Sequence, residues 1–176
     1  MDALIKYFEN RKSTLDSLLV IPKAKFTSGT FHKLRLEIKK LNALFELVNF
    51  CVKDFKRKKT FEPFKLIFKQ AGKVRELQLQ EARLKKYLAT NSLNDYLRNL
   101  KKQRLKERAL FFQIVNENFS ELLKLKYEEI LTSLSKVMDK KANLYLEKKE
   151  KRIIKLLEQS VIDKQELHEL RKQLKM

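Results

Sequence analysis

Glycine and proline are both rare in this sequence, since 2 of each occur among 176 residues. The tight turns of sheet proteins depend on these residues, so their scarcity argues against a sheet and for long helices. A chain of this length fits one domain, or two small repeats that share a core. No Gly- or Ser-rich linker divides it. We therefore expect one all-α unit, a bundle of long antiparallel helices.

Cysteine is nearly absent as well, because Cys51 is the only one. A single cysteine excludes an intramolecular disulfide and a Cys-rich metal site, and it fits a reducing compartment. The N-terminal sequence MDALIKYFEN has acidic and aromatic residues where a secretion signal has a basic stretch and then an apolar one. No window approaches the roughly 18 consecutive apolar residues of a membrane-spanning helix. We expect a cytoplasmic protein that does not cross a membrane.

Acidic residues are outnumbered, because 22 Asp and Glu stand against 41 Lys and Arg and the formal net charge is +19. A field of this size attracts polyanions, and it weakens self-association unless a counterion binds. The composition therefore predicts an anionic partner.

Apolar residues recur at helical spacing in the first half of the chain. A first helix is predicted over residues 2–19, and a second should follow Thr30 and reach about residue 55. The basic block 56–60 is expected to connect it to a third helix, which has Pro63 in its first turn and reaches about residue 88.

The second half of the chain shows the same periodicity with fewer boundary signals. A fourth helix should begin near residue 93. Residues 118–157 form either one long helix or two joined near Asp139, and the pattern leaves both open. A last helix that contains His168 should be capped by Asp163.

Both histidines of the chain begin the same pattern. The segments HKLRLEIK and HELRKQLK share His-x-Leu-Arg-x-x-(Ile/Leu)-Lys. On a helix, the offsets 0, +3 and +7 place the three polar side chains on one face, within an arc of about 60°. In the first copy an apolar stripe lies about 120° around from them, so the basic stripe should flank the core. The predicted stripe residues are His32, Arg35 and Lys39 in the first copy and His168, Arg171 and Lys175 in the second.

Such a stripe suits a ligand with closely spaced negative oxygens. A guanidinium offers a planar fork for bidentate phosphate contact, an ammonium offers a mobile charge, and an imidazole donates more strongly when it is protonated beside an anion. Like charges stacked on one helix repel each other, and binding a ligand is one reason to keep them. A phosphate chain satisfies all three donors. Among the lysines of the third helix, we expect Lys69 to add to this site.

Motifs for catalysis or metal binding are missing from the sequence. It contains no paired-carboxylate motif, nucleophile elbow, phosphate-cradling Gly-rich loop or HExxH helix. Zinc needs three or four ligands, and no Cys pair or neighbouring second histidine supplies them. We therefore expect no enzyme, no catalytic residue, no metal and no cofactor.

The segments FHKLRLEIKKLNALFELV, FKQAGKVRELQLQEARL and ELHELRKQLK, in this order, resemble the CHAD domain, the conserved histidine α-helical domain. The resemblance implies two pseudo-symmetric four-helix bundles around a basic channel that binds inorganic polyphosphate without hydrolysing it. It also implies a role in localisation to polyphosphate granules. The residues that would fall on the family's binding motifs are His32, Arg35, Lys39, Lys40, Arg75, His168, Arg171 and Lys175.

The chain departs from the family pattern in three places. Asn42 stands where the first motif usually continues with another arginine, and Glu76 replaces the aspartate of an Arg-Asp pair. The second repeat has only its opening helix, so we expect residues 1–160 to form the first bundle with its connecting helix and residues 161–176 to open an incomplete second repeat. Two explanations stay open: a shortened chain, or a half-domain completed by a second chain in a homodimer.

The leading hypothesis is non-catalytic binding of inorganic polyphosphate, or of another polyanion such as a phosphate or sulfate ion, in a basic groove. Two alternatives remain. One is a basic helical module that binds nucleic acid non-specifically, although most phenylalanines are expected in the core and not stacked on bases. The other is a scaffold whose helices after residue 118 pair with another protein.

Overall fold

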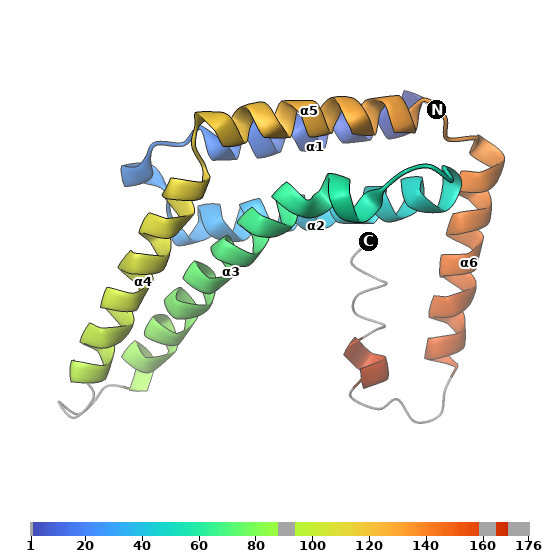
Figure 1. Ribbon diagram of the computed structural model, residues 1–176. Helices are drawn as coiled ribbons and strands as arrows, with labels where there is room; N and C mark the ends of the chain where they lie inside the picture. Colours follow the sequence, from blue (N-terminus) through green and yellow to red (C-terminus); the bar gives the residue numbers. More distant parts are fainter. Residues whose placement is uncertain (1, 88–93, 159–164, 169–176) are drawn as a thin grey trace.

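The computed structural model describes residues 2–87, 94–158 and 165–168 of the chain (Figure 1). Every regular element in these ranges is a helix, which confirms the all-α prediction. A single turn of 3-10 helix, η1, covers Lys23–Lys25. The long helices are α1 (Asp2–Leu19), α2 (Ser28–Cys51), α3 (Arg57–Tyr87), α4 (Asn94–Ile114), α5 (Glu117–Leu134) and α6 (Asp139–Leu157).

The helix α2 has the most neighbours in this arrangement, because it contacts α1, α3, α5 and α6. Figure 1 shows α1 and α5 side by side along one edge and α6 turned across the end of α2. The helix α3 spans 31 residues against 24 for α2, and its second half pairs with α4 in a hairpin that extends away from the other helices (Figure 1). Two flanks of α2 therefore face different partners, α1 on one and α3 on the other.

The core lies where the apolar stripes of α1, α2, α3 and α5 meet. The stripe predicted on α2 is completely buried, and it packs against aromatic residues from α1, α3 and α4. Burying side chains of this size provides the main stabilising free energy of such a fold. Fully buried members include Phe8, Leu15, Phe31, Leu34, Ile38, Leu41, Phe45, Phe64, Ile67, Phe111 and Ile130.

The N-terminus of α2 begins earlier than the sequence pattern indicates. Thr27, and not a residue at 29–30, is the cap: its hydroxyl accepts a hydrogen bond from the Thr30 amide at 3.2 Å, and the Thr30 hydroxyl accepts one from the Thr27 amide at 3.2 Å. This reciprocal pair is a capping box, with threonine in the place of the usual Glu or Gln. It fixes the start of the helix that carries His32 and Arg35.

The connection between α2 and α3 lies earlier in the chain than predicted. The helix α2 ends at Cys51 and α3 already begins at Arg57, so the prediction of a connecting loop over 56–60 is wrong for residues 57–60. The Thr60 amide donates to the Lys56 carbonyl at 3.0 Å, which closes the first helical turn. Pro63 consequently lies in the second turn, where the helix forgoes one backbone hydrogen bond.

The second half of the chain follows the two-helix interpretation of residues 118–157. The helix α5 ends at Leu134 and α6 begins at Asp139, the predicted joint. The side chain of Asn116 caps α5 by accepting from the Phe119 amide at 2.9 Å. Residues 165–168 form a helical turn that contains His168, whereas the predicted cap Asp163 lies outside the described residues. In the described part of the chain, no helix combines the length and apolar character needed to span a bilayer.

Candidate functional site: a basic groove between α2 and α3

The first copy of the repeated motif lies on α2 at the border between core and solvent. Leu34 and Ile38 are completely buried, whereas His32 and Lys39 are exposed and Arg35 is half-buried. This placement confirms that the basic stripe flanks the apolar one. Arg35 is the member that turns toward α3, because its guanidinium contacts that helix.

The Arg35 guanidinium lies against two α3 residues that are one helical turn apart. Its central carbon is 4.7 Å from the centre of the Phe68 ring, a cation–π distance. Gly72 is also close, since an added β-carbon there would be 3.5 Å from the same carbon. The Nε atom of Arg35 is buried and has no hydrogen-bond partner among the described residues. The guanidinium is thus held by a ring and a backbone, and no acceptor satisfies its Nε–H.

A hollow of about 570 Å³ opens beside this guanidinium. Its lining includes three cationic side chains and one carboxylate, that of Glu76, so the hollow carries a net positive charge. Lys73 also lies 3.7 Å from Glu107 of α4, a contact at the long end for an ion pair, and the Lys73 side chain is 60% exposed. Such a weakly held ammonium can turn to a ligand at low cost. The lining residues are Arg35, Phe68, Lys69, Gly72, Lys73, Glu76 and Leu79.

Arg75 stands next to this hollow and connects α3 to the start of α2. Its Nη1 donates to the hydroxyl of Ser28, the first residue of α2. Burial lowers the pKa of Arg35, the positive charge of Arg75 lowers it further, and Glu76 opposes both effects. The two guanidinium groups therefore share an electropositive region, which an anion would stabilise. We call Arg35, Lys69, Lys73 and Arg75 the basic groove.

Asn42 contacts an arginine of another helix, although it stands where the family motif usually has an arginine of its own. Arg57 of α3 donates to the Asn42 side-chain oxygen at 3.0 Å and to Glu46 at 2.7 Å. Lys149 of α6 lies 3.8 Å from the same Glu46 carboxylate. The Arg57 charge is thus compensated, and this end of the α2–α3 contact is a structural ion-pair network.

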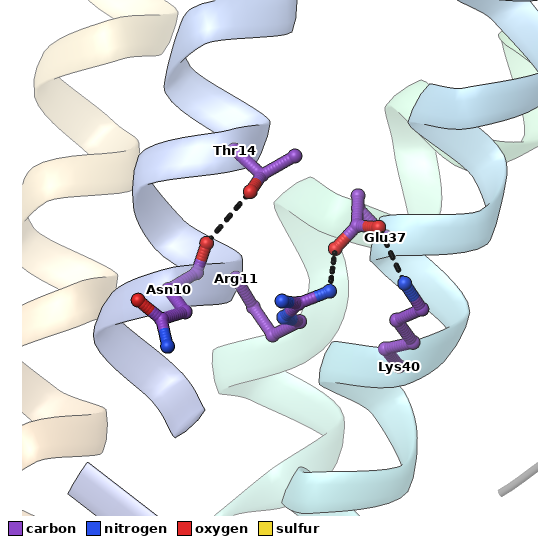
Figure 2. A network of polar contacts seen from close by, with 5 residues as sticks. All are labelled: Asn10, Arg11, Thr14, Glu37 and Lys40. Carbon is purple, nitrogen blue, oxygen red and sulfur yellow. Dashed lines mark hydrogen bonds and ion pairs between the residues drawn. The ribbon is translucent and has the colours of Figure 1, made fainter. Parts of the chain in front are cut away.

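Lys40 points to the opposite flank of α2, toward α1. Its ammonium donates to Glu37 at 2.7 Å, and Arg11 of α1 donates to the other oxygen of the same carboxylate at 3.0 Å (Figure 2). Glu37 is only 7% exposed, so this carboxylate depends on both cations. Lys40 therefore does not join Arg35, although five residues separate them in the sequence.

The structure brings three of the predicted site residues together and leaves the others apart from the hollow. Arg35 and Lys69 line the hollow, and Arg75 acts on Arg35 electrostatically without lining it. His32, Lys39 and Lys40 do not line the hollow. His168 is exposed and does not line it either. Arg171 and Lys175 lie outside the described residues. Within the described ranges, no three His, Cys, Asp or Glu side chains are grouped to hold a metal ion.

Sequence reasoning did not identify Phe68, Gly72 or Lys73 as site residues. Phe68 carries no polar atom, and its apolar character indicates a core position like those of the other phenylalanines. Lys73 is one of several lysines on α3. One signal was present: Phe68 and Gly72 are four residues apart, so they share a helical face, and a lysine follows each of them. That pattern does not say which side chain lies on the face.

The comparisons with known proteins agree with this description. Residues 24–176 match the CHAD domain, a range that contains α2–α6 and both copies of the His-x-Leu-Arg pattern, whereas α1 precedes it. Neither a curated protein nor a solved structure matches the chain. Because the match covers far more than half of the sequence, the chain belongs to the CHAD domain family.

Proposed function

We propose that this chain binds inorganic polyphosphate in the basic groove and does not hydrolyse it. One observation carries the proposal: the Arg35 guanidinium is half-buried beside a positively charged hollow, and its Nε has no acceptor among the described residues. A phosphate oxygen would supply that acceptor in a charge-assisted hydrogen bond. Membership of the CHAD family supports the same ligand class.

A linear polyanion suits the groove better than a single phosphate ion does. Lys69 and Lys73 lie one helical turn apart along α3, and both line the hollow with Arg35. A chain of phosphates can contact all three at once and release their counterions, so affinity should fall steeply with salt. We propose that His32 and Lys39, on the same face of α2, extend these contacts, and that His168, Arg171 and Lys175 provide a second set.

Isothermal titration of long-chain polyphosphate into the protein tests the proposal. Arg35→Ala should weaken binding about 10- to 150-fold, because a charge-assisted contact contributes about 1.5–3 kcal/mol. Arg98→Ala is the matched control: it removes the same formal charge, but Arg98 is 80% exposed, pairs with Asp95 and does not line the hollow. It should change affinity less than twofold. Equal losses in the two variants would reject the basic groove as the binding site.

Duplex DNA at equal phosphate concentration distinguishes the nucleic-acid alternative. The net charge of +19 gives the chain some affinity for any polyanion, which Arg35→Ala and Arg98→Ala should reduce equally. We expect polyphosphate to bind more tightly than DNA and to be the only ligand that distinguishes the two variants. Tighter DNA binding that depends on Arg35 would favour the nucleic-acid module.

Three further parts of the proposal have their own measurements. The absence of hydrolysis predicts no release of orthophosphate from polyphosphate during long incubation. Targeting to granules predicts that a fluorescent fusion co-localises with polyphosphate and that Arg35→Ala disperses it. A homodimer that joins two sets of motif residues predicts a doubled mass in sedimentation with polyphosphate, since the ligand would screen the repulsion between two basic chains.

A further inference from the structure

We propose that Phe68 is a positioning residue of the basic groove: its ring holds the Arg35 guanidinium beside the hollow while leaving the N–H groups of the guanidinium free for an anion. This inference rests on the proposed function, since it concerns how the same groove presents its central donor. The observations that carry it are the ring contact at 4.7 Å, the unpartnered Nε and the shared lining of the hollow.

An aromatic ring face and a carboxylate differ in whether they occupy the N–H donors of a guanidinium and offset its charge. A carboxylate accepts an N–H bond and offsets the positive charge, as Glu81 does for Arg104 at 2.9 Å and Glu37 does for Arg11 at 3.0 Å. An aromatic face attracts the cation through its quadrupole and accepts no N–H···O bond. Of the five N–H donors of an arginine, those on Arg35 therefore stay available while the group is held in place.

The contact with Phe68 also opposes two nearby forces on Arg35. Arg75 repels the guanidinium, and Glu76 attracts it. Glu76 is the carboxylate that lines the hollow, so an Arg35 released from the ring would move toward it. An Arg35–Glu76 pair would neutralise the site. Phe68 thus keeps the central cation of the groove from being compensated internally.

Gly72 is the second α3 residue that borders the Arg35 guanidinium. A β-carbon at this residue would lie 3.5 Å from the guanidinium carbon and 3.6 Å from Nη2, which is ordinary van der Waals contact. Alanine should therefore be tolerated, whereas a longer side chain would occupy the place of the guanidinium. The pair Phe68 and Gly72 gives two independent ways to displace Arg35 without altering any charge.

The test compares charge-neutral variants by their polyphosphate affinity and by the slope of log affinity against log salt. Phe68→Leu should weaken binding five- to tenfold and reduce the slope by about 0.7, the value for one lost contact to a single-stranded polyanion. Phe68→Tyr keeps the ring and should bind within twofold of wild type with the same slope. Gly72→Leu should behave like Phe68→Leu, and Gly72→Ala like wild type. A purely structural role of Phe68 would not change the salt slope at constant formal charge.

Combination with Arg35→Ala separates this inference from the proposed function. If Arg35→Ala weakens binding, Phe68→Leu should have no further effect in that background, because the positioned group is gone. If Arg35→Ala weakens binding while Phe68→Leu leaves affinity and slope unchanged, the positioning role is overturned and the proposed function stands. If Arg35→Ala itself leaves affinity unchanged, the proposed groove is wrong.

Helicity by circular dichroism checks that each variant folds. Should Phe68→Leu lose helicity, Phe68→Met takes its place, because methionine retains an apolar side chain that adapts to the core and removes the ring. An NMR measurement gives a second readout: the Arg35 Nε–H signal of wild type should move when polyphosphate is added, and in the Phe68 variant it should lose its ring-current shift. An Arg35 signal insensitive to both changes would overturn the inference.

Discussion

The two flanks of α2 hold their cations in different ways. On the flank toward α1, Lys40 and Arg11 both contact the carboxylate of Glu37, which is almost completely buried. On the flank toward α3, Arg35 lies against the ring of Phe68 and its Nε has no hydrogen-bond partner in the described part of the chain. Lys40 and Arg35 lie on the same helix, five residues apart. Lys40 faces a carboxylate, whereas Arg35 faces an aromatic ring.

This difference separates structural charge from charge available to a ligand. The Glu37 carboxylate forms an ion pair with both Arg11 and Lys40, so removing this carboxylate should affect the free energy of unfolding more than binding. The ring of Phe68 leaves the charge of Arg35 in place, so its removal should affect binding more than folding. The net charge of +19 does not indicate which cations are available to a ligand. The contacts of each cation do.

The largest expected effect is on stability, when the carboxylate on the α1 flank is removed. Glu37→Gln leaves Arg11 and Lys40 without their counter-ion and should lower the free energy of unfolding by about 2 kcal/mol, less than for a fully buried pair because both cations retain solvent access. Arg35→Gln should cost less than about 1 kcal/mol, since it removes one cation–π contact. Urea denaturation followed by circular dichroism measures both. Equal losses of unfolding free energy in Glu37→Gln and Arg35→Gln would contradict the view that the α1 flank holds structural charge and Arg35 does not.

The next effect is on affinity, in a pair of lysines on the two flanks. Lys69→Ala removes an ammonium that lines the hollow and should weaken polyphosphate binding three- to tenfold, or about 0.7–1.4 kcal/mol. Lys40→Ala removes the same charge from the Glu37 pair and should change affinity less than twofold. Titration at constant salt compares them. Similar losses would indicate that binding responds to net charge and not to the groove.

Much of the fold follows from the sequence because burial imposes a period of 3.6 residues on the apolar side chains of a helix. The stripe through Leu34 and Ile38 predicts α2 and its buried face, and both residues are fully buried. The same periodicity leaves open whether residues 118–157 form one helix or two, and the structure has two, with α6 beginning at Asp139. The ends of α2 and α3 are less predictable, since the capping box of Thr27 uses a threonine and since α3 tolerates Pro63 in its second turn.

The candidate site could be predicted only in part, because the identity of a residue does not state its partner. Arg35 and Lys40 both belong to the family motif, yet they face α3 and α1 respectively. Which of them remains uncompensated depends on the packing of three helices. The apolar side chain of Phe68 indicates a core position, whereas its proposed role depends on its contact with Arg35, 33 positions away in the sequence. Such contacts have no signal in the periodicity of a single helix.

A smaller effect is expected at the contact between α1 and α5, where the Asp16 carboxylate has no hydrogen bond from a cation among the described residues. Tyr127 donates to Asp16 at 2.9 Å, and burial raises the pKa of Asp16 above 3.8, although this hydrogen bond and Lys12 oppose the shift. A raised pKa in the folded state means that ionisation of Asp16 destabilises the fold, so its contribution to stability decreases as pH rises from 3.8 through the folded-state pKa.

The variant Asp16→Asn therefore should be more stable than wild type at pH 7, by no more than about 0.5 kcal/mol because solvent screens this half-buried group. The amide oxygen of asparagine still accepts from Tyr127. Thermal unfolding at pH 7 and below pH 3.8 should show the difference closing in acid, where Asp16 is protonated in both states. A wild type more stable at pH 7 would show that the charge of Lys12 outweighs burial.

The smallest effect concerns another buried polar atom without a hydrogen-bond partner. It tests whether a missing partner is enough to make a buried donor bind anions. The hydroxyl of Tyr145 in α6 is buried and has no hydrogen-bond partner among the described residues, and burial, with a smaller contribution from Glu46, raises the pKa of Tyr145 to about 12. Unlike Arg35, this group is neutral and does not border the basic groove.

Tyr145→Phe removes that hydroxyl without breaking a hydrogen bond to the described residues, so unfolding should be unchanged or up to about 1 kcal/mol more costly. Polyphosphate affinity should stay within twofold of wild type, in contrast to Arg35→Ala. Thermal unfolding and titration on the same sample measure both quantities. A weaker affinity for Tyr145→Phe would mean that any unsatisfied buried donor contributes to anion binding. Unchanged affinity would show that a buried donor without a partner is not by itself sufficient for anion binding.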